Sequence, residues 1–266
     1  MRTALTIAGS DPSGGAGIQA DLKTFAALGV YGTSAVTAIT VQNTMGVAGV
    51  SPLAADLVTA QIEAVAGDIA IHATKVGMLA TAAIVEAVAA AIVELDLPLV
   101  VIDPVLVSTS GDRLLDEDGV RVLRIELLPR ALVVTPNIPE AEALAGILVR
   151  SMDDIREAAR RIHDMGPAAV IITGGHAPRS TAQTPDIVDL VFDGHGFYEC
   201  RTPRIETPHT HGAGCTFASA VAAELALGHP LSEAASLAQR YVAGALAQSI
   251  AIGHGRGPLN HFWKRT

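Results

Sequence analysis

Short apolar runs of strand length alternate with helix-length segments along most of the chain. The expected strands are Ala4–Ala8, Ser34–Val41, Ala73–Val76, Leu99–Ile102, Leu132–Thr135 and Val170–Thr173. The expected helices lie near Ile18–Leu28, Ala54–Ala66, Ala82–Leu95, Asp118–Leu127, Pro139–Leu144 and Asp153–Met165. This β-α alternation predicts an α/β fold in which a mostly parallel sheet carries helices on its faces.

The pattern changes after residue 185. Two-residue alternation over Asp186–Glu199, with the turn-forming run Asp193–Gly196 before Phe197–Cys200, predicts a hairpin. We expect this hairpin to form an antiparallel edge of the sheet. Two Ala-rich helices should follow it, at Gly214–Leu227 and Leu231–Ile250.

The chain shows no internal repeat and no linker, so residues 1–266 are predicted to form one domain, without a fused second domain. Half of the residues are hydrophobic but only 3% are aromatic, so Ala, Val, Ile and Leu must build the core. The polar, Pro-containing stretch Ala177–Pro185 follows a strand and is a candidate lid.

Net charge and cysteine content restrict which partners the protein can bind and in which compartment it is expected. A net charge of −9 argues against nucleic acid and anionic membranes, which need a basic surface. The uncharged stretch Thr24–Ala55 is interrupted by glycines and polar residues, so it is interpreted as buried sheet plus loop and not as a membrane span. Two cysteines, Cys200 and Cys215, form no disulfide framework, and the N-terminal run is too short for a secretory signal. A cytoplasmic protein is expected.

Two glycine patterns after the first strand resemble nucleotide-binding motifs but depart from both. Gly9–Gly14 has P-loop spacing, yet Gly15-Ala16 stands where Lys and Ser or Thr must bind the phosphates and Mg²⁺. Gly15–Ala20 fits G-x-G-x-x-A, yet Val36–Val41, about 20 residues on, offers no acid for the ribose hydroxyls. The glycines still allow a backbone approach to a ligand, and a tight turn without a ligand is an equally good interpretation.

A run of small residues, His-Gly-Ala-Gly-Cys-Thr at His211–Thr216, precedes the strong helical pattern Phe217–Leu227. Free N–H groups and the helix dipole at such a start bind anions, and a thiol there, Cys215, can have a lowered pKa and serve as base or nucleophile. A plain helix start with a buried cysteine is favoured if this pattern is taken alone. His209, His211 and Cys215 could suggest a metal site. A zinc site usually needs three or four protein ligands, and no second Cys/His cluster follows in the sequence, so zinc is not expected.

Polar residues follow two of the expected strands. Asp103 comes after Leu99–Ile102, and Asn137 and Glu140 come after Leu132–Thr135. Carboxylates at the ends of two parallel strands can hold Mg²⁺ while the metal bridges phosphates. A turn at Asp103 and a charge in the first turn of a helix at Glu140 are the alternatives for each residue alone.

Together these stretches resemble the ribokinase-like superfamily and, within it, the hydroxymethylpyrimidine and hydroxymethylpyrimidine-phosphate kinases of thiamin biosynthesis. The likeness runs from Thr3 to His261 and is most specific at Ala8–Phe25 and Thr210–Thr216. Shorter anchors are Val41–Val47, Lys75–Leu79, Asp103–Val105, Thr135–Glu142, Gly174–His176 and Gly253–His261. The resemblance implies a three-layer sandwich with an antiparallel edge hairpin, a homodimer, and a kinase that uses ATP and Mg²⁺.

The resemblance also implies the substrate, 4-amino-5-hydroxymethyl-2-methylpyrimidine and then its monophosphate, which is converted to the diphosphate. Gln42 would read the amino and ring-nitrogen edge of the pyrimidine, because an amide offers both a donor and an acceptor. The other residues expected to line the substrate pocket are Ala16, Asp21, Met78 and Val105.

For the phosphate end, the resemblance implies that Asp103 and Glu140 organise Mg²⁺. The residues expected to lie at the nucleotide are Asn137, Thr173 and Gly175. The loop expected to hold the transferring phosphoryl group is Gly212, Ala213 and Gly214. Cys215 would take the hydroxymethyl proton.

The chain departs from the family pattern at two positions. Thr173 stands where the family often has Lys before Gly-Gly-His, so another cation or the metal must offset a lost ammonium at the phosphates. Ala213 replaces the usual Thr of Gly-Thr-Gly-Cys, which keeps the backbone donors but removes a hydroxyl. Two alternatives stay open: a pyridoxal or pyridoxine kinase, and a ligand-binding protein that kept the fold without catalysis. The edge hairpin is a possible dimer contact.

Overall fold

The computed structural model describes residues 1–107, 111, 114–176 and 186–265. One sheet runs in the order β3-β2-β1-β4-β5-β6-β7-β8-β9. Its strands are β1 Thr3–Ser10, β2 Tyr31–Asn43, β3 Gly46–Pro52, β4 Ala73–Val76, β5 Val100–Ile102, β6 Val133–Val134, β7 Val170–Ile172, β8 Asp186–Phe192 and β9 Phe197–Pro203. The α-helices are α1 Gly17–Ala27, α2 Ala55–Ala66, α3 Ala82–Glu94, α4 Glu117–Val122, α5 Ile138–Ala145, α6 Met152–His163, α7 Ala213–Leu227 and α8 Leu231–Ala247.

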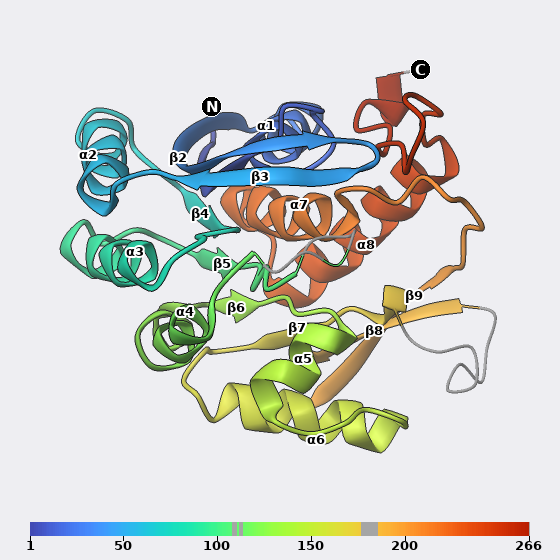
Figure 1. Ribbon diagram of the computed structural model, residues 1–266. Coiled ribbons are helices and arrows are strands. Elements are labelled where there is room, and N and C mark those ends of the chain that lie inside the picture. Colours follow the sequence, from blue (N-terminus) through green and yellow to red (C-terminus); the bar gives the residue numbers. More distant parts are fainter. Residues whose placement is uncertain (108–110, 112–113, 177–185, 266) are drawn as a thin grey trace.

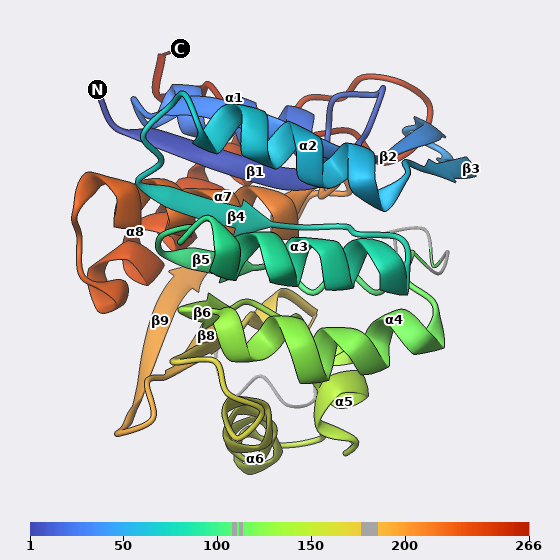
Figure 2. The same ribbon diagram turned by 90° about the vertical axis from the view of Figure 1, so that its left-hand side faces the viewer.

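The six strands from β2 to β7 in this order pair in parallel, whereas β3, β8 and β9 pair in antiparallel fashion. Helices cover both faces of the sheet, which makes three layers (Figures 1 and 2). The core on one face is built with α2 to α6, and the core on the other face with α1, α7 and α8. The predicted α/β three-layer fold is confirmed.

Helix α7 shows how the core is filled with so few aromatic residues. It packs against α1 and α8 and over the centre of the sheet, and its residues from Thr216 to Ala226 are buried. Because alanines dominate this stretch, neighbouring backbones can approach closely on every side. A helix that is apolar all round belongs in such an interior position. This packing on α1, α8 and the sheet fixes the position of the amino terminus of α7 at the edge of the sheet.

The structure corrects several expected boundaries. Gly46–Pro52, interpreted as loop, is the strand β3, so the sheet has antiparallel strands at both edges and not only at the β8–β9 hairpin. Two glycines and the exposure of β3 hide the apolar alternation that marks a strand. The expected helix Asp118–Leu127 changes after α4 into a π-helical turn at Leu123–Leu127. The candidate lid Ala177–Pro185 lies outside the described residues.

Among the residues that the structure describes, no helix has the length and apolarity needed to cross a membrane.

Candidate active site

A cleft of about 430 Å³ opens at the carboxyl ends of the parallel strands. Open α/β sheets bind their ligands at this edge. Thirteen of the fourteen predicted site residues line the cleft: Ala16, Gln42, Met78, Asp103, Val105, Asn137, Glu140, Thr173, Gly175, Gly212, Ala213, Gly214 and Cys215. The exception is Asp21, which is fully buried below the cleft. Residues predicted for separate roles therefore meet in one place.

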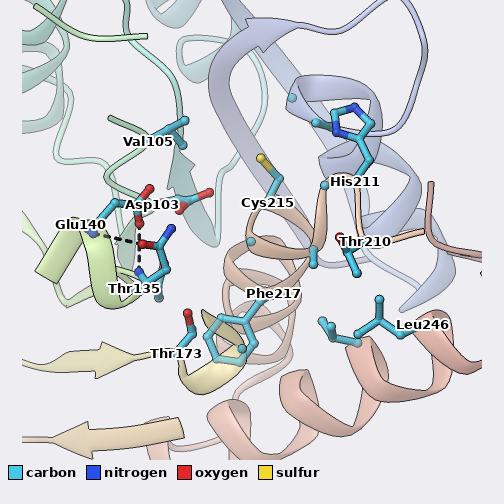
Figure 3. A pocket seen from close by; sticks show the side chains of 18 of the residues that line it. Asp103, Val105, Thr135, Glu140, Thr173, Thr210, His211, Cys215, Phe217 and Leu246 are labelled. Atoms are coloured by element: carbon cyan, nitrogen blue, oxygen red, sulfur yellow. Dashed lines mark hydrogen bonds between the residues drawn. The ribbon is translucent and has the colours of Figure 1, made fainter. Parts of the chain in front are cut away.

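An acidic pair forms one wall of the cleft. Asp103 follows β5 and Glu140 lies in the first turn of α5, which follows the neighbouring strand β6 (Figure 3). The Asn137 side chain caps this helix, because its Oδ1 accepts from the Glu140 N–H at 3.0 Å. The Glu140 Oε2 accepts from the Asn137 N–H at 2.9 Å. The capping box thus fixes Glu140 beside Asp103.

Burial raises the pKa of Asp103 to about 6, an effect that the nearby Lys75 ammonium partly offsets. Burial, and then the charge of Asp103, raises the pKa of Glu140 to about 8. Two carboxyl groups that disfavour each other's charge are a good environment for a cation. Mg²⁺ is typically held by one or two carboxylates together with substrate phosphates. The two acids fit this donor set, and the described residues contain no group of three His, Cys, Asp or Glu for a fuller cage.

These pKa values predict how stability changes with pH. The folded protein keeps the two protons at pH values where the unfolded chain, with ordinary carboxyl pKa values of 3.8 and 4.5, has released them. The folded state then binds more protons, so the free energy of unfolding falls as the pH rises from about 4.5 towards 8. We expect the thermal midpoint without Mg²⁺ to fall over this range, and less steeply in Glu140→Gln. A flat profile in the wild-type protein would contradict the buried acidic pair.

The opposite wall is the amino terminus of α7. Gly212 precedes the helix with a left-handed φ of 82°, and an added Cβ would lie 1.8 Å from the carbonyl oxygen of Gly15. Only glycine fits this close approach of two backbone segments. The Ala213 N–H donates to the Thr210 carbonyl at 3.2 Å, so Gly212 and Gly214 are better placed than Ala213 to hold an anion.

Cys215 faces the acidic pair from the first turn of α7 (Figure 3). The sequence suggests a lowered pKa, but burial raises the pKa of this thiol to about 12 despite the nearby Lys75 charge. The thiol therefore keeps its proton at neutral pH. A thiolate that already stands ready as a base does not agree with this environment.

Asp11 explains why the first glycine loop is not a P-loop. Its carboxylate accepts hydrogen bonds from the backbone N–H groups of Ser13, Gly15 and Ala16 at 2.8, 3.1 and 2.9 Å. In a P-loop such N–H groups face phosphate. Burial opposes ionisation of Asp11, but the bonds from His211 and Ser13 outweigh it and lower its pKa to about 2. The loop therefore binds its own carboxylate.

His211 joins this loop to the start of α7 and lies beside Gln42 of β2. Its Nε2 lies 2.8 Å from Asp11 Oδ2 and 3.4 Å from the side-chain amide of Gln42. The same amide lies 3.1 Å from the Thr40 hydroxyl, which donates to the Ser10 carbonyl at 2.9 Å. The Nε2 proton goes to the ionised Asp11, so His211 lies against the Gln42 amide without a hydrogen bond. The Thr40 hydroxyl has one proton and can donate it to Gln42 only in place of the Ser10 carbonyl.

At the other end of the cleft, the sheet passes from β7 to β8. The Gly174 N–H donates to the buried Asp189 carboxylate at 2.8 Å, and Thr173, Gly175 and Asp189 all line the cleft. Arg204, just after β9, is a basic lining residue that the sequence did not reveal as part of the site. A lone arginine after an expected hairpin carries no motif signal, so only the fold identifies it.

A buried network lies below the floor of the cleft. Asp21 accepts from Thr6 and Ser219 hydroxyls at 2.6 Å each, and its Oδ2 lies 3.1 Å from the Lys75 ammonium. Asp21 therefore does not line the substrate pocket as expected, but holds Lys75, which does line it. The sequence does carry a signal for Lys75, since a charged residue inside a buried parallel strand requires a partner.

Comparisons with known proteins identify the family to which this chain belongs. The family model described as phosphomethylpyrimidine kinase matches residues 11–260. A hydroxymethylpyrimidine/phosphomethylpyrimidine kinase of Bacillus subtilis (strain 168) is 48% identical over 97% of this chain and 94% of its own.

Two solved structures share the fold. The ADP complex of Bacillus subtilis pyridoxal kinase has a TM-score of 0.90 and 41% identity, over 100% of this chain and 99% of that one. The phosphomethylpyrimidine kinase of Clostridium difficile 630 has a TM-score of 0.81 and 39% identity, over 92% and 100%. Since the family model covers nearly the whole chain, this protein belongs to the phosphomethylpyrimidine kinase family and is a phosphotransferase.

Proposed function

We propose that this protein uses ATP and Mg²⁺ to phosphorylate 4-amino-5-hydroxymethyl-2-methylpyrimidine, and then its monophosphate, in cytoplasmic thiamin biosynthesis. The observation that carries the proposal is that the Gln42 amide, the Asp103–Glu140 pair and the amino terminus of α7 line one cleft. Phosphoryl transfer depends mainly on positioning and charge stabilisation, and these elements supply both.

Each wall has a distinct task in this proposal. Gln42 orients the pyrimidine ring between Met78 and Val105. Asp103 and Glu140 would hold Mg²⁺, whose charge would offset that of the phosphates. Gly212 and Gly214 hold the transferring phosphoryl group with backbone N–H groups, and the positive end of the α7 dipole supports them. The thiol of Cys215, which lines the cleft with Asp103, orients the hydroxymethyl oxygen by hydrogen bonding.

The first test is a coupled assay with Mg·ATP in which hydroxymethylpyrimidine, its monophosphate and pyridoxal are offered separately. Products are identified by mass. We expect the pyrimidine monophosphate and then the diphosphate. Absence of turnover with all three substrates would contradict the proposal.

Pyridoxal is the second candidate substrate. The favouring observation is the 41% identity to a pyridoxal kinase over the full chain, with a TM-score of 0.90. Both substrates carry a hydroxymethyl group on a nitrogen ring, so one cleft can admit both. If only pyridoxal is phosphorylated, the proposed site residues stand and the proposed role in thiamin biosynthesis is wrong.

Arg204 is expected to bind the nucleotide, since Thr173 lacks the ammonium that the family often has there. Replacing it by Ala should raise KM for ATP about tenfold and change kcat little, because a charge-assisted contact to phosphate is lost. Steady-state kinetics with varied ATP measure this. Arg201→Ala is the matched control, because Arg201 lies on β9 outside the lining residues. An unchanged KM for ATP in Arg204→Ala would contradict the assignment.

A homodimer completes the proposal. The β2–β3 edge exposes Ile39, Val41 and Met45, at 47%, 66% and 67%, whereas the β8–β9 edge exposes charged side chains such as Arg201. Exposed apolar clusters favour association, so β2–β3 is the better contact. Val41→Asp should convert a dimer to a monomer in sedimentation velocity. Val93→Asp on α3, with an equally exposed valine at 61%, should leave the dimer intact.

A further inference from the structure

The Lys75 ammonium is a buried cation that the phosphate and metal assignments leave without a role. It lies in β4 on the side of the sheet that faces α1 and α7, and its side chain is fully buried. Of its three N–H donors, one has a partner among the described side chains, the Asp21 carboxylate at 3.1 Å. Burial alone lowers the pKa of a lysine, but nearby acidic groups, Asp21 first, outweigh this and raise the pKa of Lys75. The ammonium is therefore permanent.

This ammonium belongs to the acceptor end of the cleft. Lys75 is one of the residues that line the cleft, as Cys215 and Asp103 are, and its ammonium lies directly beneath the cleft surface, where the charges of Asp21 and Asp103 act on it. The one arginine among the described lining residues, Arg204, follows β9 at the nucleotide end. Strands β4 and β9 are five positions apart in the sheet, on the order of 20 Å at the usual strand spacing.

The two phosphorylation steps make different demands at this end. The first acceptor is a neutral hydroxyl group. The second acceptor is a phosphate monoester, which carries a charge of about −1.5 to −2 at neutral pH and must approach another phosphate. The acidic lining residues make this harder: Asp11, Asp103, Glu140, Asp189 and Glu206. A fixed cation beside the acceptor matters most when the acceptor is itself an anion.

We propose that Lys75 is a catalytic residue for the second phosphorylation, in which its ammonium donates a hydrogen bond to an oxygen of the acceptor phosphate. In that step another acceptor oxygen forms a bond to the γ-phosphorus of ATP. The bond from this phosphorus to the β,γ-bridging oxygen breaks, and ADP leaves with the electron pair. The dianionic acceptor has no proton to release, so the step needs charge and no base. This role rests on the proposed two-step function.

Gly77 makes room for the ammonium. A Cβ at this position would lie 2.6 Å from the Lys75 Nζ, which is the movable end of a flexible side chain. Gly77→Ala is therefore expected to push the ammonium aside while the charge and the fold remain. It complements the double variant Lys75→Met with Asp21→Asn, which removes both charges of the buried pair together.

The experiment measures kcat/KM separately for hydroxymethylpyrimidine and for its monophosphate, at saturating Mg·ATP. In Gly77→Ala and in the double variant, we expect the ratio of the second step to the first to fall about 10- to 100-fold, the usual effect of losing a charged hydrogen bond. Ser219→Ala, which removes one bond to Asp21 and leaves Lys75 in place, controls for a purely structural effect. It should change both steps by the same factor.

The outcomes separate this inference from the proposed function. If Gly77→Ala leaves the ratio of the two kcat/KM values unchanged, the role of Lys75 is overturned, even when the wild-type protein performs both steps. Thermal unfolding identifies a double variant that does not fold, and Gly77→Ala then decides alone. A wild-type protein that cannot phosphorylate the monophosphate overturns the second step of the proposed function, and the role of Lys75 with it.

Discussion

Asp103→Asn is expected to lower kcat/KM by about 10²- to 10³-fold, the usual range when one preorganised electrostatic group is removed from a transition state. Asparagine keeps the shape of the side chain but removes the negative charge that, with Glu140, fits Mg²⁺. The remaining activity should need more Mg²⁺ than the wild-type protein does. A Mg²⁺ titration of the initial rate at fixed ATP measures both effects.

Glu140→Gln should behave in the same way, since the capping box places its carboxyl group beside Asp103. Asp189→Asn is the matched control, because Asp189 is also a buried carboxyl group in the cleft but binds the Gly174 N–H. Its Mg²⁺ requirement should stay that of the wild-type protein. An unchanged Mg²⁺ requirement in both Asp103→Asn and Glu140→Gln would remove the metal assignment.

Gly212→Ala is expected to damage both activity and stability. Its Cβ would lie 1.8 Å from the Gly15 carbonyl oxygen, a backbone atom that no rotamer change can move, and its φ of 82° disfavours any side chain. Left-handed strain and overpacking together should lower the free energy of unfolding by about 2–4 kcal/mol. The start of α7 must also shift, and misplacement by about 1 Å can cost 10²-fold in rate.

Urea unfolding and steady-state kinetics measure these two effects. Gly214→Ala is the matched control for stability, because an added Cβ there meets no atom within 4 Å. Its free energy of unfolding should stay within about 0.5 kcal/mol of the wild-type value. A Gly212→Ala protein as stable as Gly214→Ala would show that the two backbone segments do not need their close approach.

The site could be predicted where simple geometric rules apply. Asp103 and Glu140 follow neighbouring parallel strands, and such strands end at the same edge of a sheet. The small residues before α7 were expected at the same edge because a helix start there has free N–H groups, and Gly212 to Gly214 do line the cleft. The substrate role of Gln42 came from the family resemblance alone.

Other residues needed the three-dimensional structure. Asp21 shares a conspicuous motif with the glycine loop, but the sequence does not say that its face of α1 turns towards α7 and the sheet. The pKa of Cys215 was expected to be lowered by the helix start, and burial proved the stronger effect. Arg204 carries no motif of its own, so its place in the cleft follows only from the order of the strands. Lys75 begins one of the family anchors, but that motif does not say that its side chain faces Asp21 on α1.

The pair formed by Asp11 and His211 has a consequence for synthesis of the protein. These residues are 200 positions apart, yet their contact joins the first loop to the start of α7. A ribosome adds about 5–20 residues per second, so the first loop waits at least about 10 s for its partner. During that time the carboxylate of Asp11 can bind the loop's own N–H groups, which lie within five residues of it. These local hydrogen bonds thus favour the folded turn in the nascent chain before the segment that contains His211 has been synthesised.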